Sequence, residues 1–147
     1  MLTISTKTFK ELTIDELYAI LQLRSEIFVV EQNCVYQDLD YKDQNGLHVL
    51  GYKDHKIVAY TRIFKPDDYF EHASIGRVLV KAEERHLKYG YTIMEASINE
   101  IEKRYNETKI KISAQAHLKN FYNTLGFKEI GDVYFEDGIP HIGMIKD

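Results

Sequence analysis

The stretch RVLVKAEERHLKYGYTIME, residues 77–95, contains the most informative change of pattern in this chain. It begins with aliphatic residues typical of a strand and ends with the apolar spacing of a helix. The turn between them gathers four basic residues, Lys81, Arg85, His86 and Lys88. Main-chain N–H groups at a helix start are unpaired and lie at the positive end of the helix dipole, so they attract anions. The stretch therefore predicts a phosphate or pyrophosphate site, although a solvated basic turn has the same composition.

The glycine of this turn, Gly90, would let the main chain approach such a ligand closely. The turn lacks the Gly-Lys-Ser/Thr of a Walker loop and the three glycines of a dinucleotide fingerprint. Its ligand class therefore has to be argued from the rest of the chain.

Length and composition exclude several classes of protein. With 147 residues we expect a single domain, residues 1–147, around one core. A formal net charge of −4 argues against a nucleic-acid partner. We expect no membrane partner, because no long uncharged apolar run is present, and a cytoplasmic location, because nothing indicates export. Cys34 is the only cysteine, which excludes an internal disulfide.

The order of expected elements predicts the fold class. Strands are predicted at 3–9, 74–80 and 109–114, and two hairpins at 47–64 and 127–145. Helices are expected after Thr13, where Glu16 completes a capping box, at about 90–104, and around 118–125. The order β-α-β-β-β-α-β-α-β-β indicates an α/β fold. We expect a mixed, mostly antiparallel central sheet of six to seven strands flanked by helices.

The first helix carries two charged residues, Arg24 and Glu31, on its apolar stripe. Burying a charge is costly unless it is paired, so these residues form an internal ion pair or line a cleft. The acidic loop 34–46 follows. Its spacing does not fit a calcium loop, because Lys42 occupies a position that requires an oxygen ligand. We expect no metal site.

Two segments resemble motifs of the GCN5-related N-acetyltransferases, the GNAT family. Arg85 and Gly90 match the outer positions of motif A, and Lys88 replaces its middle glycine. The segment AQAHLKNFYNTLGF, residues 114–127, resembles motif B. The segments FVVEQNCVYQDLD, AQAHLKNFY and YFEDGIPHIGM look like the ElaA-type branch of the family. The resemblance covers nearly the whole chain and implies an acyl-CoA N-acyltransferase fold.

The resemblance implies a site for acetyl-CoA. The backbone of Val78, Leu79 and Val80 would pair with the pantetheine arm. The pyrophosphate would be held by the turn and helix start, comprising Arg85, His86, Lys88, Tyr89, Gly90 and Tyr91. Gln115 would bond the cofactor, and Tyr122 would lie near the sulfur as the acid that protonates the thiolate. From spacing alone, core packing is the better interpretation of Tyr122.

Acceptor binding is assigned to five residues, Arg24, Glu31, Asp38, Asp40 and His141. With Glu136 and Asp137, the acidic members of this set form either an anionic entrance for a cationic amine or a solvated surface. His117 and His141 are candidate proton carriers, and His48 is ambiguous. We expect Cys34 to be a packed or exposed thiol and not a nucleophile.

The sequence thus predicts an enzyme, an acetyl-CoA-dependent N-acetyltransferase that moves an acetyl group directly to a primary amine. The acceptor would be a small molecule or a peptide, and a homodimer is one option for the assembly. One alternative is a non-catalytic acyl-CoA-binding regulatory module. A plain structural domain is another, for which acetyl-CoA would produce no thermal shift.

Overall fold

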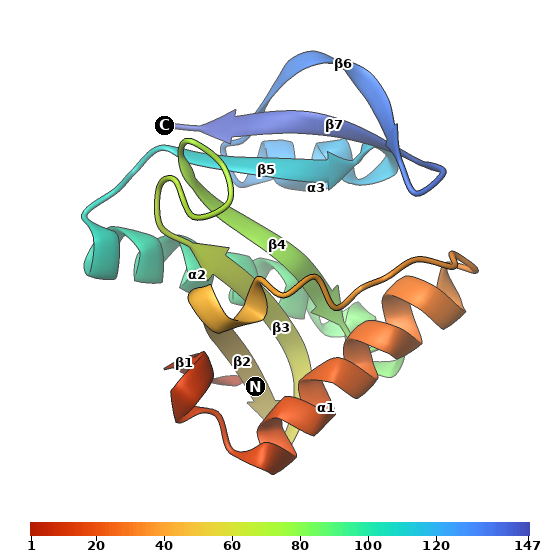
Figure 1. Ribbon diagram of the computed structural model, residues 1–147, viewed down its shortest axis with the longest axis vertical. Helices are drawn as coiled ribbons and strands as arrows, with labels where there is room; N and C mark the ends of the chain where they lie inside the picture. The colour runs from red at the N-terminus through yellow and green to blue at the C-terminus, as the bar shows by residue number, and fades with distance from the viewer.

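The computed structural model describes residues 1–147 and contains one seven-stranded sheet in the order β1-β2-β3-β4-β5-β7-β6 (Figure 1). Adjacent strands are antiparallel except for the β4–β5 pair, which is parallel. The strands are β1 (Thr3–Thr8), β2 (Leu47–Lys53), β3 (Lys56–Phe64), β4 (Ala73–Val80), β5 (Ile110–Gln115), β6 (Lys128–Glu136) and β7 (Ile139–Lys146). The predicted mixed, mostly antiparallel sheet is confirmed.

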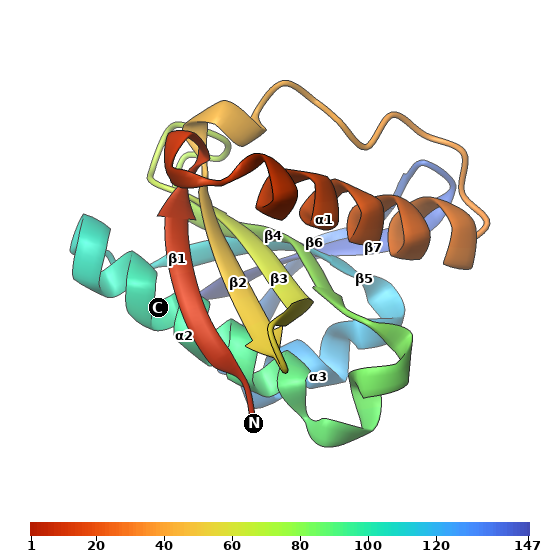
Figure 2. The ribbon, with the colours of Figure 1, turned by 90° about the horizontal axis from the view of Figure 1, so that it is seen from below.

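Helices cover both faces of the sheet (Figure 2). On one face lies α1 (Ile14–Arg24), which continues directly into a π-helical turn, η2 (Ser25–Glu31). On the other face lie α2 (Tyr89–Tyr105) and α3 (Lys119–Thr124). Four short 3₁₀ turns complete the chain: η1 (Phe9–Glu11), η3 (Asp43–Asn45), η4 (Ala82–Leu87) and η5 (Ala116–Leu118). None of its helices combines the length and apolar character needed to cross a bilayer.

Local sequence rules account for the element boundaries. At the start of α1, Thr13 Oγ1 accepts from the Glu16 N–H at 3.0 Å, and Glu16 Oε1 accepts from the Thr13 N–H at 2.9 Å. This is the predicted capping box. The β6–β7 hairpin turns at Asp137 and Gly138, whose φ angles of +50° and +79° suit a two-residue turn.

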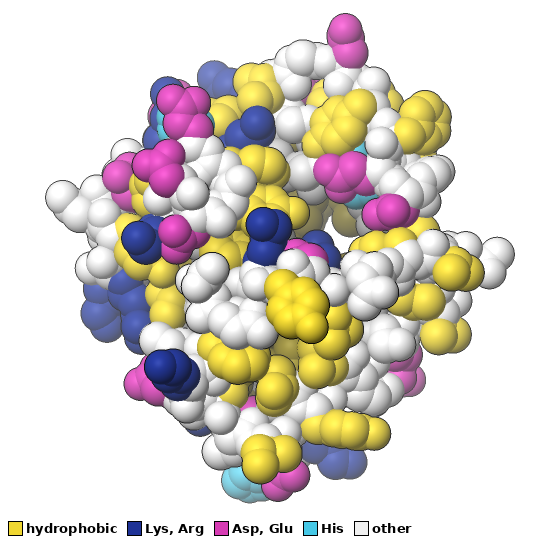
Figure 3. Space-filling view, viewed as in Figure 1, with side chains coloured by type: hydrophobic (Ala, Val, Ile, Leu, Met, Phe, Trp, Pro, Cys, Tyr) yellow, Lys and Arg dark blue, Asp and Glu magenta, His cyan; other side chains and the backbone are white.

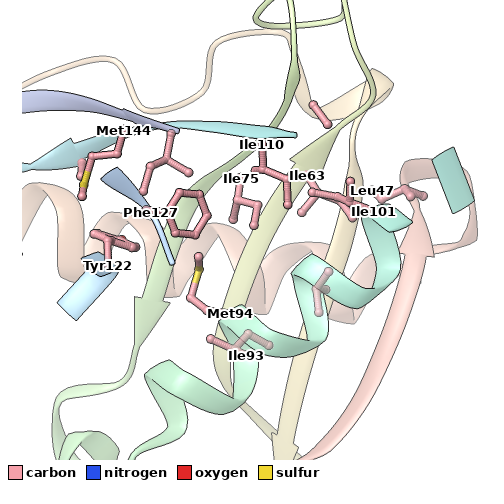
Figure 4. Packing of buried hydrophobic residues seen from close by; sticks show 14 of the residues in the cluster. Leu47, Ile63, Ile75, Ile93, Met94, Ile101, Ile110, Tyr122, Phe127 and Met144 are labelled. Carbon is pink, nitrogen blue, oxygen red and sulfur yellow. The ribbon is translucent and has the colours of Figure 1, made fainter. Parts of the chain in front are cut away.

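The larger core lies between the sheet and the helices α2 and α3 (Figure 4). Ile93, Met94 and Ile101 of α2 pack here against Ile75 of β4 and Ile110 of β5. A smaller cluster packs beneath α1 and η2 and consists of Ile20, Leu23, Ile27, Leu50, Tyr60 and Leu79. Burying each such aliphatic side chain stabilises the fold by about 1.5–3 kcal/mol. Because β4 contributes Ile75 to the larger cluster and Leu79 to the smaller one, it is packed on both faces.

The sheet splits between β4 and β5. These strands pair only at Ala73 with Ile110 and at Ser74 with Lys111, and beyond those pairs they diverge (Figure 1). On its other edge β4 carries a bulge, because its register with β3 shifts between Tyr60 and Arg62. At this bulge Arg77 has a φ of +50°, which is unusual for a residue with a side chain.

Candidate active site

A cleft of about 570 Å³ occupies the gap between the diverging strands. Residues from η2, β4, the start of α2, β5, α3 and the β6–β7 turn line it. Figure 3 shows the molecule hollowed near the centre of one face, with basic and acidic side chains at the rim. The cleft is therefore reached from the surface and bounded by both halves of the sheet.

One wall of the cleft is the free edge of β4. Val78, Leu79 and Val80 all line it. Leu79 and Val80 pair with β3 on their other side, whereas β5 has already diverged. Apart from the Val80 carbonyl, which accepts from Arg85 Nε, main-chain groups on the cleft side of this segment are therefore available to an extended ligand that pairs as an added strand.

The start of α2 has none of the caps that close the start of α1. No side chain caps it, and its first turn contains no acidic residue. By contrast, α1 begins with a capping box and carries Asp15 and Glu16 in its first turn. Lys88, which precedes α2, takes the left-handed conformation with a φ of +60°. It thus adopts a backbone conformation favoured by the glycine that it replaces in motif A. The first N–H groups of α2 therefore have no capping side chain, and the anion site at this helix start stays a prediction.

Other residues of this turn contribute differently from the prediction. Arg85 lines the cleft, but its Nε donates to the Val80 carbonyl at 3.0 Å and its Nη1 pairs with Glu31 at 2.7 Å. Tyr89 is buried, and its hydroxyl accepts from the N-terminal ammonium of Met1 at 3.1 Å. The Tyr89 and His86 side chains do not line the cleft. Arg85 is therefore a link between η2 and β4, and Tyr89 can offer only its main-chain N–H.

Gly90 has a packing role that the sequence did not reveal. A Cβ atom at this position would lie 3.3 Å from Cζ of Phe121. Phe121 in turn lies against Tyr91 and Tyr122, with ring centroids 4.8 and 5.0 Å away. Gly90 therefore lets α3 approach the start of α2, in addition to any approach of a ligand.

Gln115, at the end of β5, lines the cleft and exchanges two hydrogen bonds with Gln32, which directly follows η2. Both bonds are 3.2 Å long. The pair bridges the helix side of the cleft to the β5 side. A cofactor that forms a hydrogen bond with Gln115 would replace one of the two hydrogen bonds from Gln32.

Tyr122 lies on α3 with its ring in the larger core (Figure 4), and it also lines the cleft. Burial raises the pKa of its hydroxyl to about 12, and no other cause contributes. The phenol therefore stays protonated at neutral pH and is free to donate a hydrogen bond into the cleft. The position of Tyr122 fits a core aromatic, because its ring packs in the core, and it also fits a residue of the site, because Tyr122 borders the cleft.

Arg24 is fully buried and forms an internal ion pair instead of lining the cleft. Its Nε donates to Asp38 Oδ2 at 2.8 Å and its Nη1 to Asp43 Oδ1 at 2.7 Å. Burial tends to raise the pKa of Asp43, but hydrogen bonds and charges from Arg24 and Arg62 outweigh it and lower that pKa. Arg24 thus anchors the acidic loop beneath α1.

Two further arginines complete this buried network. Arg62 binds both oxygens of Asp40 at 2.9 Å and also Asp43 at 2.8 Å. Arg77, at the β4 bulge, binds the Asp38 carboxylate at 2.8 Å and Asp40 at 3.5 Å. Burial would raise the pKa of Asp40, but the hydrogen bonds and charge of Arg62 lower it to about 2. Three arginines and three aspartates therefore neutralise one another.

The predicted anionic entrance is wrong for Asp38 and Asp40, since neither lines the cleft and arginines bind both. Substrate contact is wrong for Arg24 for the same reason. Glu31 does line the cleft, yet its partner is Arg85 and not Arg24. The sequence signal that could have indicated this network is an arginine within each of two apolar strands, Arg62 and Arg77.

The remaining candidates divide between cleft and interior. His141, His117, Glu136 and Asp137 all line the cleft. His48 is buried away from it, where its Nδ1 contacts the Tyr60 hydroxyl at 2.6 Å and its Nε2 contacts the Asp43 carbonyl at 2.9 Å. Cys34 also lines the cleft. It is a buried thiol that donates to the Asp137 carbonyl at 3.2 Å, so of the two expected states, packed or exposed, it is packed.

Comparison with known proteins gives concordant matches over nearly the whole chain. The family model described as an acetyltransferase (GNAT) domain matches residues 15–147. Protein ElaA of Escherichia coli K12 is 47% identical over 139 residues, which are 93% of this chain and 91% of that protein. The crystal structure of Escherichia coli ElaA superposes with a TM-score of 0.92 at 43% identity, covering 100% of both chains. An acyl-CoA N-acyltransferase from Pseudomonas aeruginosa superposes with a TM-score of 0.94 at 39% identity, again over 100% of both chains.

Proposed function

Because this chain belongs to the GNAT acetyltransferase family, we propose that it transfers the acetyl group of acetyl-CoA directly to a primary amine. It is an N-acyltransferase enzyme by family, and an acyl-CoA is its co-substrate. The choice of acetyl among acyl groups, and of the acceptor, is the part we propose.

The free edge of β4, which leads directly to the uncapped start of α2, is the observation that carries this proposal. The β4 edge at Val78, Leu79 and Val80 offers main-chain partners to the amide-bearing pantetheine arm, through those N–H and C=O groups that do not bond β3. The chain then turns through η4 to the N–H groups of Tyr89, Gly90 and Tyr91, where a pyrophosphate would be bound. Lys88 supplies a positive charge beside that site. A single CoA molecule presents both chemistries in this order.

The chemistry of direct transfer requires little covalent help from the protein. Holding amine and thioester in line supplies much of the acceleration. A main-chain N–H of the β4 bulge, where Arg77 and Val78 have no direct ladder partner on β3, would polarise the thioester carbonyl. Tyr122 would protonate the departing CoA thiolate.

We propose a cationic primary amine as the acceptor, carried on a small molecule or on a peptide. Glu136 and Asp137 place acidic side chains at the cleft, and neither forms an ion pair with Lys or Arg. An unprotonated amine is the nucleophile, so the site also has to remove a proton. A non-catalytic acyl-CoA sensor would share the β4 edge and the α2 start, but it would not require Tyr122.

The test combines a binding assay with a turnover assay. We expect acetyl-CoA at about 100 times its Kd to stabilise the protein by roughly 2.7 kcal/mol, measured as a rise in Tm. Thiol release is then followed with ethanolamine, spermidine, Nα-acetyllysine and a short peptide with a free N-terminus. A rise in Tm without turnover of any amine would support the sensor, and no rise in Tm would refute both functions.

A further inference from the structure

A chain of polar side chains crosses the face of the β5-β7-β6 half-sheet beside the cleft. Ser113 Oγ donates to Glu136 Oε1 at 3.1 Å, and because its single proton is used there, the Tyr134 hydroxyl donates to Ser113. Glu136 Oε2 lies 3.5 Å from Nε2 of His141. The Tyr134 ring stacks on the imidazole with centroids 6.2 Å apart. These contacts position the Glu136 side chain beside His141.

The tautomer of His141 is fixed by its other nitrogen. Nδ1 lies 2.7 Å from the main-chain carbonyl of Ile139, which can only accept a hydrogen bond. Nδ1 therefore carries the proton, and in the neutral ring Nε2 holds a lone pair. His141 is only 9% exposed and lines the cleft, where β7 pairs it with Gln115. Its one unprotonated nitrogen thus lies beside Glu136 at the cleft.

Few other ionisable groups surround this ring. Tyr134 and Glu136 face it from β6, and Asp137 lies in the adjoining turn. The Cys34 thiol reaches the same turn through its bond to the Asp137 carbonyl. β5 presents the uncharged Ser113 and Gln115 on this side. The groups that these elements present beside the ring are therefore acidic or neutral.

We propose that His141 is the general base of the reaction and that Glu136 stabilises the imidazolium that forms. This inference rests on the proposed function. Nε2 takes one proton from the acceptor ammonium, and the amine nitrogen then forms its bond to the thioester carbon. As the intermediate collapses, the C–S bond breaks and the thiolate takes a proton from Tyr122. The second proton lost by nitrogen restores the Tyr122 phenol, and His141 releases its proton to solvent.

Two variants distinguish the role of Nδ1 from that of Nε2. In His141→Asn the side-chain amide can still donate to the Ile139 carbonyl, but no base remains. In His141→Gln the amide reaches toward the Nε2 position and the bond to Ile139 is lost. We expect kcat/KM of His141→Asn to fall by about 10²–10³, with Tm and acetyl-CoA affinity unchanged. The rising limb of its pH profile should disappear, and Glu136→Gln should lose part of kcat/KM because the imidazolium no longer has a carboxylate partner.

Acceptor basicity gives a readout that a structural role would not affect. Hydroxylamine is largely unprotonated at neutral pH, so it needs no base, whereas the alkylamines of the panel are protonated. The deficit of His141→Asn should therefore be small with hydroxylamine and large with the alkylamines. An equal deficit with both would assign His141 a purely structural role. His55→Asn, in the exposed β2–β3 turn, is the matched control.

Two outcomes would overturn the proposal directly. One is loss of the rising limb in His117→Asn together with its retention in His141→Asn, which would transfer the role to His117. The other is a ¹⁵N imidazole spectrum showing the proton of neutral His141 on Nε2. This spectrum needs no substrate, so it tests His141 even if acetyl-CoA causes no thermal shift and the proposed function fails.

Discussion

Arg77 binds Asp38 twice, through the carboxylate with Nε at 2.8 Å from Oδ1 and through the main-chain carbonyl with Nη2 at 2.8 Å. The two residues come from the β4 bulge and from the acidic loop. Asp38 is held in turn by Arg24 of α1. The bulge that lines the cleft is thereby fixed to the first helix through one residue, Asp38.

The Arg77 bulge gives the first prediction. Arg77→Ala removes the ion pair and keeps a Cβ atom at a φ of +50°, whereas Arg77→Gly removes the ion pair and relieves the backbone strain. We expect both variants to lose about tenfold in kcat, roughly 1.4 kcal/mol, because the bulge is no longer fixed. Arg77→Gly should have the higher Tm. Unchanged kcat in both variants would show that the bulge needs no support from Asp38.

Lys88 allows charge and backbone conformation to be separated. Lys88→Ala and Lys88→Gly remove the same charge, but only glycine is relaxed at a φ of +60°. We expect Lys88→Gly to be about 1 kcal/mol more stable than Lys88→Ala in urea denaturation. Calorimetry should show the same loss of acetyl-CoA affinity in both. A larger loss in alanine would mean that the backbone conformation at Lys88, and not its charge, holds the phosphates.

For Tyr122 we expect the phenylalanine variant to lose about 10² in kcat with Tm and acetyl-CoA affinity unchanged. Because burial raises the pKa of the hydroxyl to about 12, Tyr122 remains protonated across the assay range. It should therefore cause no fall in kcat on the alkaline side. The deficit should shrink with a thioester whose leaving thiol is more acidic. Tyr18→Phe, on the exposed face of α1, is the control, and full kcat in Tyr122→Phe would leave only the packing role.

The buried charge network predicts an asymmetric effect on stability. Asp43→Asn leaves Arg24 and Arg62, both about 1% exposed, facing a neutral amide. Breaking a buried pair in this way lowers the free energy of unfolding by about 3–5 kcal/mol. The exposed Asp132→Asn should change it by less than about 0.5 kcal/mol. Urea denaturation of the two variants measures the difference, and similar values would show that the network contributes nothing to stability.

The lowered pKa of Asp40 predicts how the stability of the fold changes at acidic pH. Its pKa is lowered to about 2 in the folded chain, below the usual 3.8, so its contribution is complete above the unfolded value. That contribution is lost as the pH falls from about 4 toward about 2. Tm measured across this window should fall less steeply in Asp40→Asn than in the parent. Glu16, whose pKa is also lowered to about 2, keeps part of the slope in both, and identical slopes would contradict the prediction.

Features governed by local rules could be predicted from the sequence. The Thr13–Glu16 capping box, the Asp137-Gly138 turn and the alternation of Ile110, Ile112 and Ala114 depend on neighbours in the chain, and all three are confirmed. Tyr122, which motif B indicates, lines the cleft, while its place near the cofactor sulfur stays a prediction.

The partner of Glu31 could not be predicted because the helix changes its geometry. Placing Arg24 and Glu31 on one stripe assumes 3.6 residues per turn, but η2 has π-type bonds, such as Gln32 N–H to the Ile27 carbonyl at 3.3 Å. The wider turns rotate Glu31 toward Arg85. The Arg77–Asp38 contact joins residues far apart in sequence, so neither periodicity nor motif spacing indicates it.

The split between β4 and β5 has a mechanical consequence. Only two residue pairs join the two halves of the sheet across that seam, fewer than between any other neighbouring strands, so the fewest main-chain bonds resist sliding there. A pantetheine arm bonded along β4 would fill the seam and transmit force between the halves. Rigidity of the whole molecule would then depend on its co-substrate, and release of CoA would restore the compliance that admits the next molecule.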